Sequence, residues 1–141
     1  MNSITYSLGN DIDLDAVTRL YRESTLGERR PVDNKPVMEA MIRNANLVIT
    51  AWHESKLVGL SRSLTDFAYV AYLADLAVHL EYQNLGIGTE LVAQTRSALE
   101  PTCLLTLLAA PKANDFYPKI GFEHHPRAWV IGPEVDPKTI L

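Results

Sequence analysis

The sequence predicts an α/β fold, a mixed and mostly antiparallel β-sheet flanked by helices. Apolar residues recur at helical spacing in several segments, and short runs rich in β-branched and aromatic residues lie between turn residues. One strand–helix–strand crossover follows strands that are predicted to form hairpins. The length of 141 residues favours a single domain over residues 1–141, and a content of 47% hydrophobic residues is enough to build its core.

The N-terminal part of the chain is predicted to hold two helices. Asp13 can cap the first, which should begin near Leu14. Its apolar stripe consists of Leu14, Val17, Leu20 and Tyr21. The polar segment Ser24–Lys35 is expected to be a loop. Pro36 suits the first position of the second helix, where its missing N–H would have no intrahelical partner in any case.

The middle of the chain is predicted to alternate strands with turns. Leu47–Trp52 and Leu57–Leu64 should form a hairpin, and a long strand should follow at Tyr69–Val78. A helix is expected from about Leu85 to Leu99. The continuous apolar run Cys103–Leu108 is typical of a strand that is covered on both faces.

The C-terminal part is expected to add a short helix at Ala113–Lys119. A strand should start at Gly121, and a last strand should span Ala128–Ile131. His53 and His79 are expected to lie in turns and to face water.

Bulk properties exclude several classes of protein. The net charge of −4 argues against a nucleic-acid partner, which usually selects a basic face. Cys103 is the single cysteine, so it cannot form an intrachain disulfide, and we expect a buried thiol. The chain has no apolar stretch of about 20 residues and no signal-peptide pattern, so we expect no membrane partner and a cytoplasmic protein. His124 and His125 are adjacent and would point to opposite faces of a strand, so no metal site is expected.

A glycine-containing turn is the most informative segment. A predicted strand ends at Leu76–Val78, and Gln83–Gly88 leads into a helix. The first N–H groups of a helix have no internal partner and carry the positive end of the helix dipole, so they bind phosphate. A dinucleotide-binding fold would have a third Gly or Ala where this chain has Leu91. No Gly-Lys-Ser/Thr follows either, which argues against a P-loop.

This segment resembles the acetyl-CoA motif of the GNAT superfamily of N-acetyltransferases, Gln/Arg-x-x-Gly-x-Gly/Ala, through Gln83, Gly86 and Gly88. The resemblance implies the GNAT fold, acetyl-CoA as acyl donor, and a β-bulge that opens the strand Asp75–Val78 to the pantetheine arm. It assigns cofactor contacts to Leu76, Ala77, Val78, Gln83, Asn84, Leu85, Gly86, Ile87, Gly88, Thr89 and Asn114.

A second motif lies downstream, in the order that the family has. Ala113–Phe122 resembles Ala-x-x-Phe-Tyr-x-Lys-x-Gly-Phe, and the resemblance implies that Tyr117 protonates the departing CoA thiolate. The chain departs from the family at Ala110, where Asn is frequent, and at Pro118. The two motifs together are more specific than either alone, and the resemblance extends over Leu47–Ile131.

The general base is left open by the sequence. Asp75 precedes the expected thioester-binding position and is a candidate, although the sequence favours a structural or partly solvated carboxylate there. Glu28 lies in a loop where the family gathers acceptor contacts, yet Glu28, Arg29 and Arg30 also read as a solvated run of charges. Water and backbone carbonyls are the third possibility.

The predicted function is transfer of an acetyl group from acetyl-CoA to an amine by direct attack in a ternary complex. A small-molecule amine is expected as acceptor rather than a protein N-terminus or lysine. The alternative is a non-catalytic acyl-CoA sensor or an interaction domain. The resemblance also implies a possible homodimer.

Overall fold

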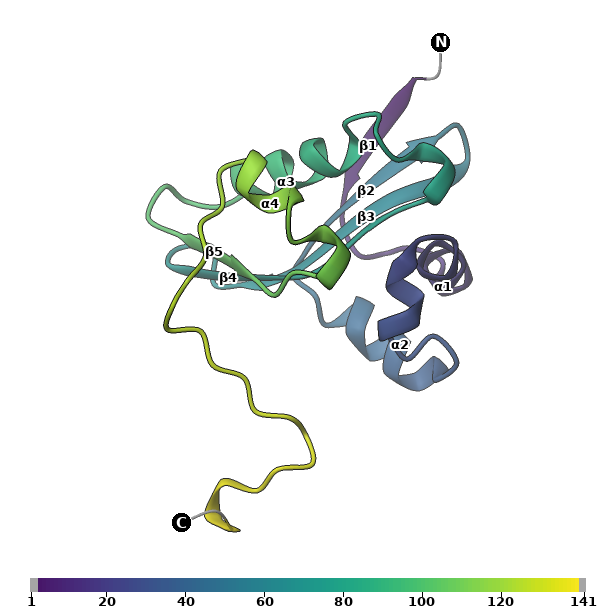
Figure 1. Ribbon diagram of the computed structural model, residues 1–141. Coiled ribbons are helices and arrows are strands. Elements are labelled where there is room, and N and C mark those ends of the chain that lie inside the picture. The colour runs from purple at the N-terminus through teal and green to yellow at the C-terminus, as the bar shows by residue number, and fades with distance from the viewer. Residues whose placement is uncertain (1–2, 140–141) are drawn as a thin grey trace. The chain divides into compact units, whose positions relative to one another are not determined.

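The computed structural model describes residues 3–139. The chain forms two compact units, Met1–Leu108 and Ala109–Leu141. Unit 1 holds a five-stranded sheet (Figure 1). Its strands are β1 (Ile4–Leu8), β2 (Leu47–His53), β3 (Lys56–Thr65), β4 (Val70–Val78) and β5 (Leu104–Leu107), and its α-helices are α1 (Leu14–Glu23), α2 (Lys35–Arg43) and α3 (Ile87–Ser97). The prediction of one domain over 1–141 stays a prediction.

The sheet is mixed, as the sequence predicted. Its spatial order follows the chain, β1-β2-β3-β4-β5. The first four strands pair antiparallel, whereas β5 pairs parallel to β4. That parallel pair needs a crossover, and α3 supplies it. The predicted strand–helix–strand unit is therefore confirmed.

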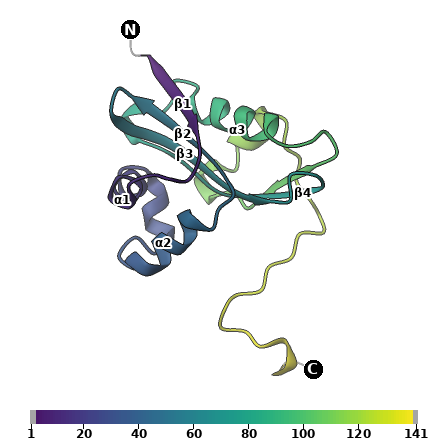
Figure 2. The ribbon, with the colours of Figure 1, turned by 180° about the vertical axis from the view of Figure 1, so that it is seen from behind.

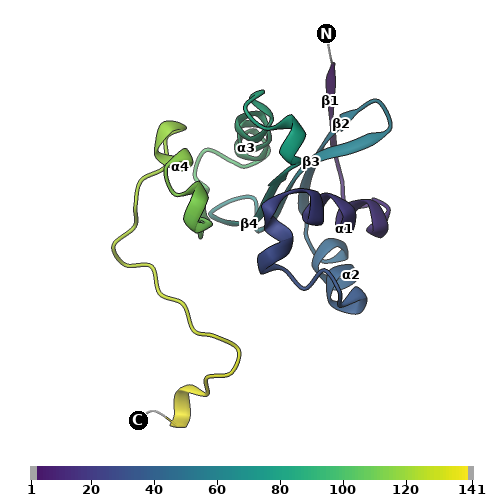
Figure 3. The ribbon, with the colours of Figure 1, turned by 45° about the vertical axis from the view of Figure 1, so that its right-hand side comes forward.

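Helices cover both faces of the sheet in unit 1. Figures 1 and 2 show α1 and α2 on one face and α3 on the other, and in Figure 3 the sheet lies between them. Each face has its own apolar cluster. The buried side chains of α1 and α2 form one cluster, with Val17, Leu20, Met38 and Ile42. Ile87 and Leu91 of α3 belong to the cluster on the opposite face. The apolar stripe predicted for α1 is thus buried as expected.

Several boundaries differ from the predictions for local reasons. α1 begins at Leu14 as predicted, but the Asp13 side chain makes no capping hydrogen bond. α3 begins at Ile87 rather than near Leu85, because Gly86 precedes it in the left-handed region with φ of 84°. The 3₁₀ helix η1 (Thr25–Arg29) interrupts the expected loop.

Gly59 brings the start of α3 close to the sheet. A Cβ atom at Gly59 would lie 3.0 Å from Cγ2 of Ile87 and 3.1 Å from Cδ1 of Leu91. Gly59 pairs with Val78 across the β3–β4 ladder. The first turn of α3 therefore packs beside the C-terminal end of β4.

Two predictions about β-structure are wrong. The run Cys103–Leu108 was expected to be covered on both faces, but β5 is the edge strand of the sheet and Leu104 is 64% exposed. Residues 109–139 hold no strand, contrary to the two strands expected there. Trp129 is 91% exposed and makes no ladder with any other described strand. A segment forms a strand only where another strand can hydrogen-bond to it. The local pattern of apolar residues does not say whether such a strand is present.

Unit 2 contains short helical turns. They are η3 (Pro111–Ala113), α4 (Phe116–Lys119) and η4 (Pro137–Thr139). The short helix predicted over Ala113–Lys119 is present as α4, preceded by a separate 3₁₀ turn. No helix within residues 3–139 has the length and hydropathy required to cross a bilayer.

Candidate functional site

A β-bulge interrupts the β3–β4 ladder at the middle of β4. Arg62 of β3 pairs with Asp75, but the next residue, Ser63, pairs with Leu73, so Ala74 is an extra residue on β4. The pairing with β5 ends at Leu73. The bulge implied by the GNAT resemblance is therefore present, one residue before the expected stretch.

Beyond the bulge, one edge of β4 presents main-chain groups that the sheet does not use. His79 N–H donates to Val58 C=O, which fixes the phase of the β3–β4 ladder. Because hydrogen-bonding pairs alternate along antiparallel strands, the peptide groups of Leu76 and Val78 point away from β3. Gln83 confirms this direction, because its Nε2 donates to Val78 C=O at 3.1 Å. We call the stretch Leu76–Val78 the open edge of β4.

Ala77 behaves differently from its two neighbours. The same alternation turns its peptide group toward Leu60 of β3. Its side chain is buried in the core beneath α1 and α2. Of the three strand residues expected to contact the cofactor, Leu76 and Val78 therefore have main-chain groups that lie outside the β3–β4 ladder, and Ala77 does not; the Val78 carbonyl accepts from Gln83.

The glycine turn gives α3 an uncapped N-terminus. Asn84 and Gly86 both adopt positive φ, 65° and 84°, and Gly86 has no side chain to cap the helix. The first main-chain bond of α3 runs from Glu90 N–H to Gly86 C=O. The N–H groups of Ile87, Gly88 and Thr89 therefore have no intrahelical acceptor. Gln83 to Gly86 and Thr89 are exposed, whereas the Ile87 side chain is buried, so Ile87 can offer a ligand only its N–H group.

The open edge and the helix start lie next to each other. Gly59 pairs with Val78 at the end of the open edge, and the same glycine is in contact range of Ile87. A ligand with an extended amide chain and a phosphate could bind both at once, because an extended chain adds to a strand edge and a phosphate binds a helix N-terminus.

The conformation of Gly86 gives a testable prediction. A Cβ atom there would meet no atom within 4 Å, so it would project into open space at the turn. Because φ at Gly86 is positive, any L-residue there would be strained. We expect Gly86→Ala to weaken acetyl-CoA binding by about tenfold, or about 1.4 kcal/mol, as measured by calorimetric titration.

Gly9 offers the matched control for this prediction. It also has positive φ, 134°, with no atom within 4 Å of a Cβ position, but it lies after β1. Gly9→Ala should cost similar stability and leave acetyl-CoA affinity unchanged. Equal affinity of a folded Gly86→Ala protein and the wild type would contradict a role for this turn.

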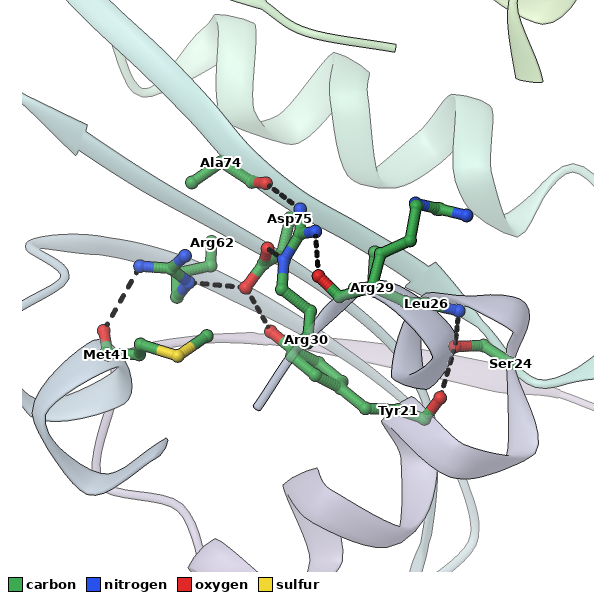
Figure 4. A network of polar contacts seen from close by, with 9 residues as sticks. All are labelled: Tyr21, Ser24, Leu26, Arg29, Arg30, Met41, Arg62, Ala74 and Asp75. Atoms are coloured by element: carbon green, nitrogen blue, oxygen red, sulfur yellow. Dashed lines mark hydrogen bonds and ion pairs between the residues drawn. The ribbon is translucent and has the colours of Figure 1, made fainter. Parts of the chain in front are cut away.

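Asp75 lies in a buried polar cluster rather than at an open surface (Figure 4). Its side chain is fully buried, and both carboxylate oxygens are occupied. Oδ1 accepts from Arg30 Nε at 2.6 Å. Oδ2 accepts from Tyr21 Oη at 2.6 Å and from Arg62 Nε at 2.5 Å. We call Tyr21, Arg30, Arg62 and Asp75 the Asp75 cluster.

The electrostatics of the cluster keep Asp75 ionised. Burial acts to raise the pKa of Asp75, but the hydrogen bond and charge of Arg62, the hydrogen bond of Tyr21 and the charge of Arg30 outweigh it, so the pKa lies below its usual value. Burial and the neighbouring Asp75 charge raise the pKa of Tyr21 well above normal. A fully buried carboxylate with a lowered pKa, which already accepts three hydrogen bonds, is a poor acceptor for an amine proton. The structural alternative for Asp75 is therefore the better supported one.

His79 is another polar residue whose position the sequence did not predict. It is buried rather than solvent-facing, and its Nε2 lies 2.8 Å from Glu23 Oε2. Its Nδ1 accepts from Glu81 N–H at 3.1 Å. These contacts hold the segment between β4 and the glycine turn against the end of α1.

In unit 2, Tyr117 lies in α4 and Asn114 immediately precedes Asp115, the N-cap residue of that helix. The Tyr117 ring packs against Phe116 and Phe122, with ring centroids 5.1 and 5.4 Å apart. Burial raises the pKa of Tyr117, so the phenol stays protonated at neutral pH. Asn114 is exposed.

Cys103 is a free, buried thiol, as predicted. Its sulfur lies 3.9 Å from Thr65 Oγ1. Within residues 3–139, no group of three or more His, Cys, Asp or Glu side chains is arranged to hold a metal ion.

Comparison with known proteins assigns the chain to a family. The profile of the acetyltransferase (GNAT) domain matches residues 23–129. An N-acetyltransferase of Pyropia yezoensis, ycf52, is 33% identical over 93 residues, which cover 60% of this chain and 52% of that protein. A chloroplastic GCN5-related N-acetyltransferase of Arabidopsis thaliana is 37% identical over 75 residues, covering 52% of this chain and 29% of that protein. The chain thus spans about half, or less, of the length of these relatives.

Solved structures of acetyltransferases share the fold. A GNAT family protein from Streptococcus pneumoniae superposes with a TM-score of 0.73 at 23% identity, over 92% of this chain and 98% of that one. An aminoglycoside N-acetyltransferase in complex with CoA gives a TM-score of 0.73 at 15% identity, over 96% and 97% of the two chains. These identities carry the fold alone. With the family profile matching most of its length, the chain belongs to the GNAT acetyltransferase domain family.

Proposed function

We propose that this protein is an N-acetyltransferase that uses acetyl-CoA and acetylates a small-molecule amine by direct attack in a ternary complex. The observation that carries the proposal is the open edge of β4 next to the uncapped start of α3. This juxtaposition gives one row of main-chain groups for an amide-bearing arm and one cluster of N–H groups for a pyrophosphate. Family membership supports the same chemistry.

The residues that would hold acetyl-CoA divide into two groups. The peptide groups of Leu76 and Val78 that point away from β3 would bind the pantetheine arm and the thioester carbonyl. The N–H groups of Ile87, Gly88 and Thr89 would bind the pyrophosphate. The Gln83 side chain donates a hydrogen bond to Val78 C=O. We expect this side chain to move when a ligand donates to the same carbonyl. When bound, acetyl-CoA would supply a thioester whose carbonyl carbon is open to attack by an amine.

Main-chain groups would bind acetyl-CoA, so the role that remains for side chains is proton transfer. Tyr117 is the proposed donor to the departing thiolate, because its raised pKa keeps the proton on the phenol. Since a free thiol has a pKa of ~8.5, the phenol is the weaker acid, and transfer to the thiolate is uphill until solvent returns a proton to the tyrosinate. Asp75 is committed to Arg30, Arg62 and Tyr21, which leaves Glu28 or ordered water with backbone carbonyls to accept the amine proton.

The acceptor class is argued from the relatives and from the net charge of the chain. Neighbours in fold include aminoglycoside acetyltransferases, one of them solved with sisomicin. The net charge of −4 suits a cationic amine. Among sequence relatives, a Glycine max protein named as a histone acetyltransferase is 25% identical over 139 residues, so a lysine acceptor is the second candidate.

Two measurements separate the enzyme from a non-catalytic acyl-CoA sensor. Calorimetric titration should show saturable binding of acetyl-CoA. Thiol release should then rise with a panel of aminoglycosides, polyamines, amino acids and a lysine-bearing peptide. Binding without release for any amine would favour the sensor, and release with the peptide alone would favour a protein acceptor. The homodimer that the resemblance implies is also a proposal, which sedimentation would test.

A further inference from the structure

Arg30 joins the segment after α1 to the bulge of β4. It follows η1, and each of its three guanidinium nitrogens donates a hydrogen bond (Figure 4). Nε donates to Asp75 Oδ1 at 2.6 Å, and Nη2 donates to Ala74 C=O at 2.9 Å. Nη1 donates to Arg29 C=O at 2.9 Å, which also fixes the segment that carries the arginine.

The bulge leaves the Ala74 carbonyl without a hydrogen-bond partner on β3. Ala74 is the extra residue between Leu73 and Asp75 in the β3–β4 register. The ladder with β5 ends at Leu73, immediately before it. A half-buried carbonyl in this position needs a donor, and Arg30 provides one. The bond therefore stabilises β4 in the bulged form that exposes the open edge.

We infer that Arg30 is a positioning residue for catalysis, which holds the open edge of β4 in the conformation that receives the thioester. The charge run Glu28-Arg29-Arg30 suggested a solvated arginine, but the Arg30 side chain is only 26% exposed. Ala74 lies two residues before Leu76, so a shift of the bulge moves the peptide group that would bind the thioester carbonyl. The kinetic part of this inference rests on the proposed function, whereas its structural part does not.

Arg30 and Arg62 have different tasks within the Asp75 cluster. Arg62 is the more deeply buried, and with Tyr21 it still neutralises and bonds Asp75 when Arg30 is removed. Loss of Arg30 therefore leaves no buried carboxylate without a partner, and the protein should fold. Lysine is a poor substitute, because one ammonium lacks the planar fork that reaches Asp75 and Ala74 together.

The first test is hydrogen exchange of the protein without ligand. In Arg30→Ala, main-chain amides in peptides that cover Leu73–Val78 should exchange about tenfold faster, because the bulge opens more often. Arg22→Ala is the matched control. Arg22 bonds Asp33 Oδ1 at 2.5 Å and also holds the segment after α1, but on the exposed side, and its hydrogen bonds go to Val32 and Asp33 rather than to β4. Exchange over Leu73–Val78 should be unchanged in this control.

The second test is kinetic and uses the amine that gives the fastest thiol release. Arg30→Ala should lower kcat by about tenfold, Arg30→Lys should stay impaired, and added guanidinium should restore part of the Arg30→Ala rate. Arg22→Ala should retain the wild-type kcat. A folded Arg30→Ala protein with wild-type exchange over Leu73–Val78 would overturn the inference, as would a wild-type kcat. If the wild-type protein releases no thiol, the proposed function fails, and the exchange result alone still decides the role of Arg30 at the bulge.

Discussion

Replacing Asp75 by alanine should lower the free energy of unfolding by about 3–5 kcal/mol, the cost of breaking a buried ion pair by removing one partner. The substitution leaves Arg62 buried without its carboxylate and Tyr21 Oη without its acceptor. Arg30 is partly exposed and can be rehydrated, so most of the cost comes from Arg62. Urea denaturation followed by circular dichroism measures the difference.

A surface aspartate provides the control. Asp33 pairs with Arg22, and their side chains are 93% and 53% exposed. Asp33→Ala should change stability by about 0–1 kcal/mol, as for other exposed pairs. If Asp75→Ala were as mild as Asp33→Ala, the Asp75 cluster would not be a structural centre, and Asp75 would again be a candidate for the general base.

The contribution of Asp75 to the free energy of unfolding should depend on pH. Because the pKa of Asp75 is lower in the folded state than in the unfolded chain, its contribution is present above the unfolded value of ~3.9 and is lost as the pH falls through the folded value. The difference in stability between wild type and Asp75→Ala should therefore be constant near neutral pH and shrink in strong acid. A difference that grows on acidification would contradict the lowered pKa.

Replacing Tyr117 by phenylalanine should lower kcat by about 10²–10⁴-fold, the usual value of general acid catalysis. The ring contacts with Phe116 and Phe122 do not need the hydroxyl, so the packing of unit 2 should be kept. Acetyl-CoA affinity should change little, because the hydroxyl acts on the leaving group. The rate must be measured with a true acceptor, since slow hydrolysis would hide the effect.

Tyr69→Phe is the control for the loss of a phenol. Tyr69 is 71% exposed and lies before β4, so its hydroxyl should not influence the reaction. A Tyr117→Phe protein that turns over at the wild-type rate, under conditions where chemistry limits the rate, would make Tyr117 a packing residue. Water would then protonate the thiolate.

The elements with strong periodicity could be predicted from the sequence. The stripe of α1, the β2–β3 hairpin and the crossover through α3 all have local patterns that bury one face. β1 was missed because its short segment Ile4–Leu8 mixes serine and threonine with apolar residues and is only partly buried. The two strands expected in residues 121–131 were wrong because a strand depends on a partner that local sequence does not specify.

The candidate site was predictable where it depends on the main chain. Gly86 and Gly88 mark the helix start, and a glycine at positive φ is a local property that the sequence reveals. The Asp75 cluster was not predictable, because its members come from α1, the segment after η1, β3 and β4. Only the fold brings Arg30 and Asp75 together, 45 positions apart in the chain. A charge next to two other charges, such as Arg30, gives no signal that it is half-buried against a carboxylate.

The most direct test of the central claim is the stoichiometry of one reaction. Purified protein, acetyl-CoA and the best amine from the panel are mixed, and free thiol and acetylated amine are quantified together by absorbance and mass spectrometry. Acetyl transfer at the open edge of β4 predicts about one acetylated amine for each thiol released, with both rates reduced in parallel by Gly86→Ala and unaffected by Gly9→Ala. Thiol release that is independent of the amine, or acetyl-CoA binding without any acetylated product, would contradict it.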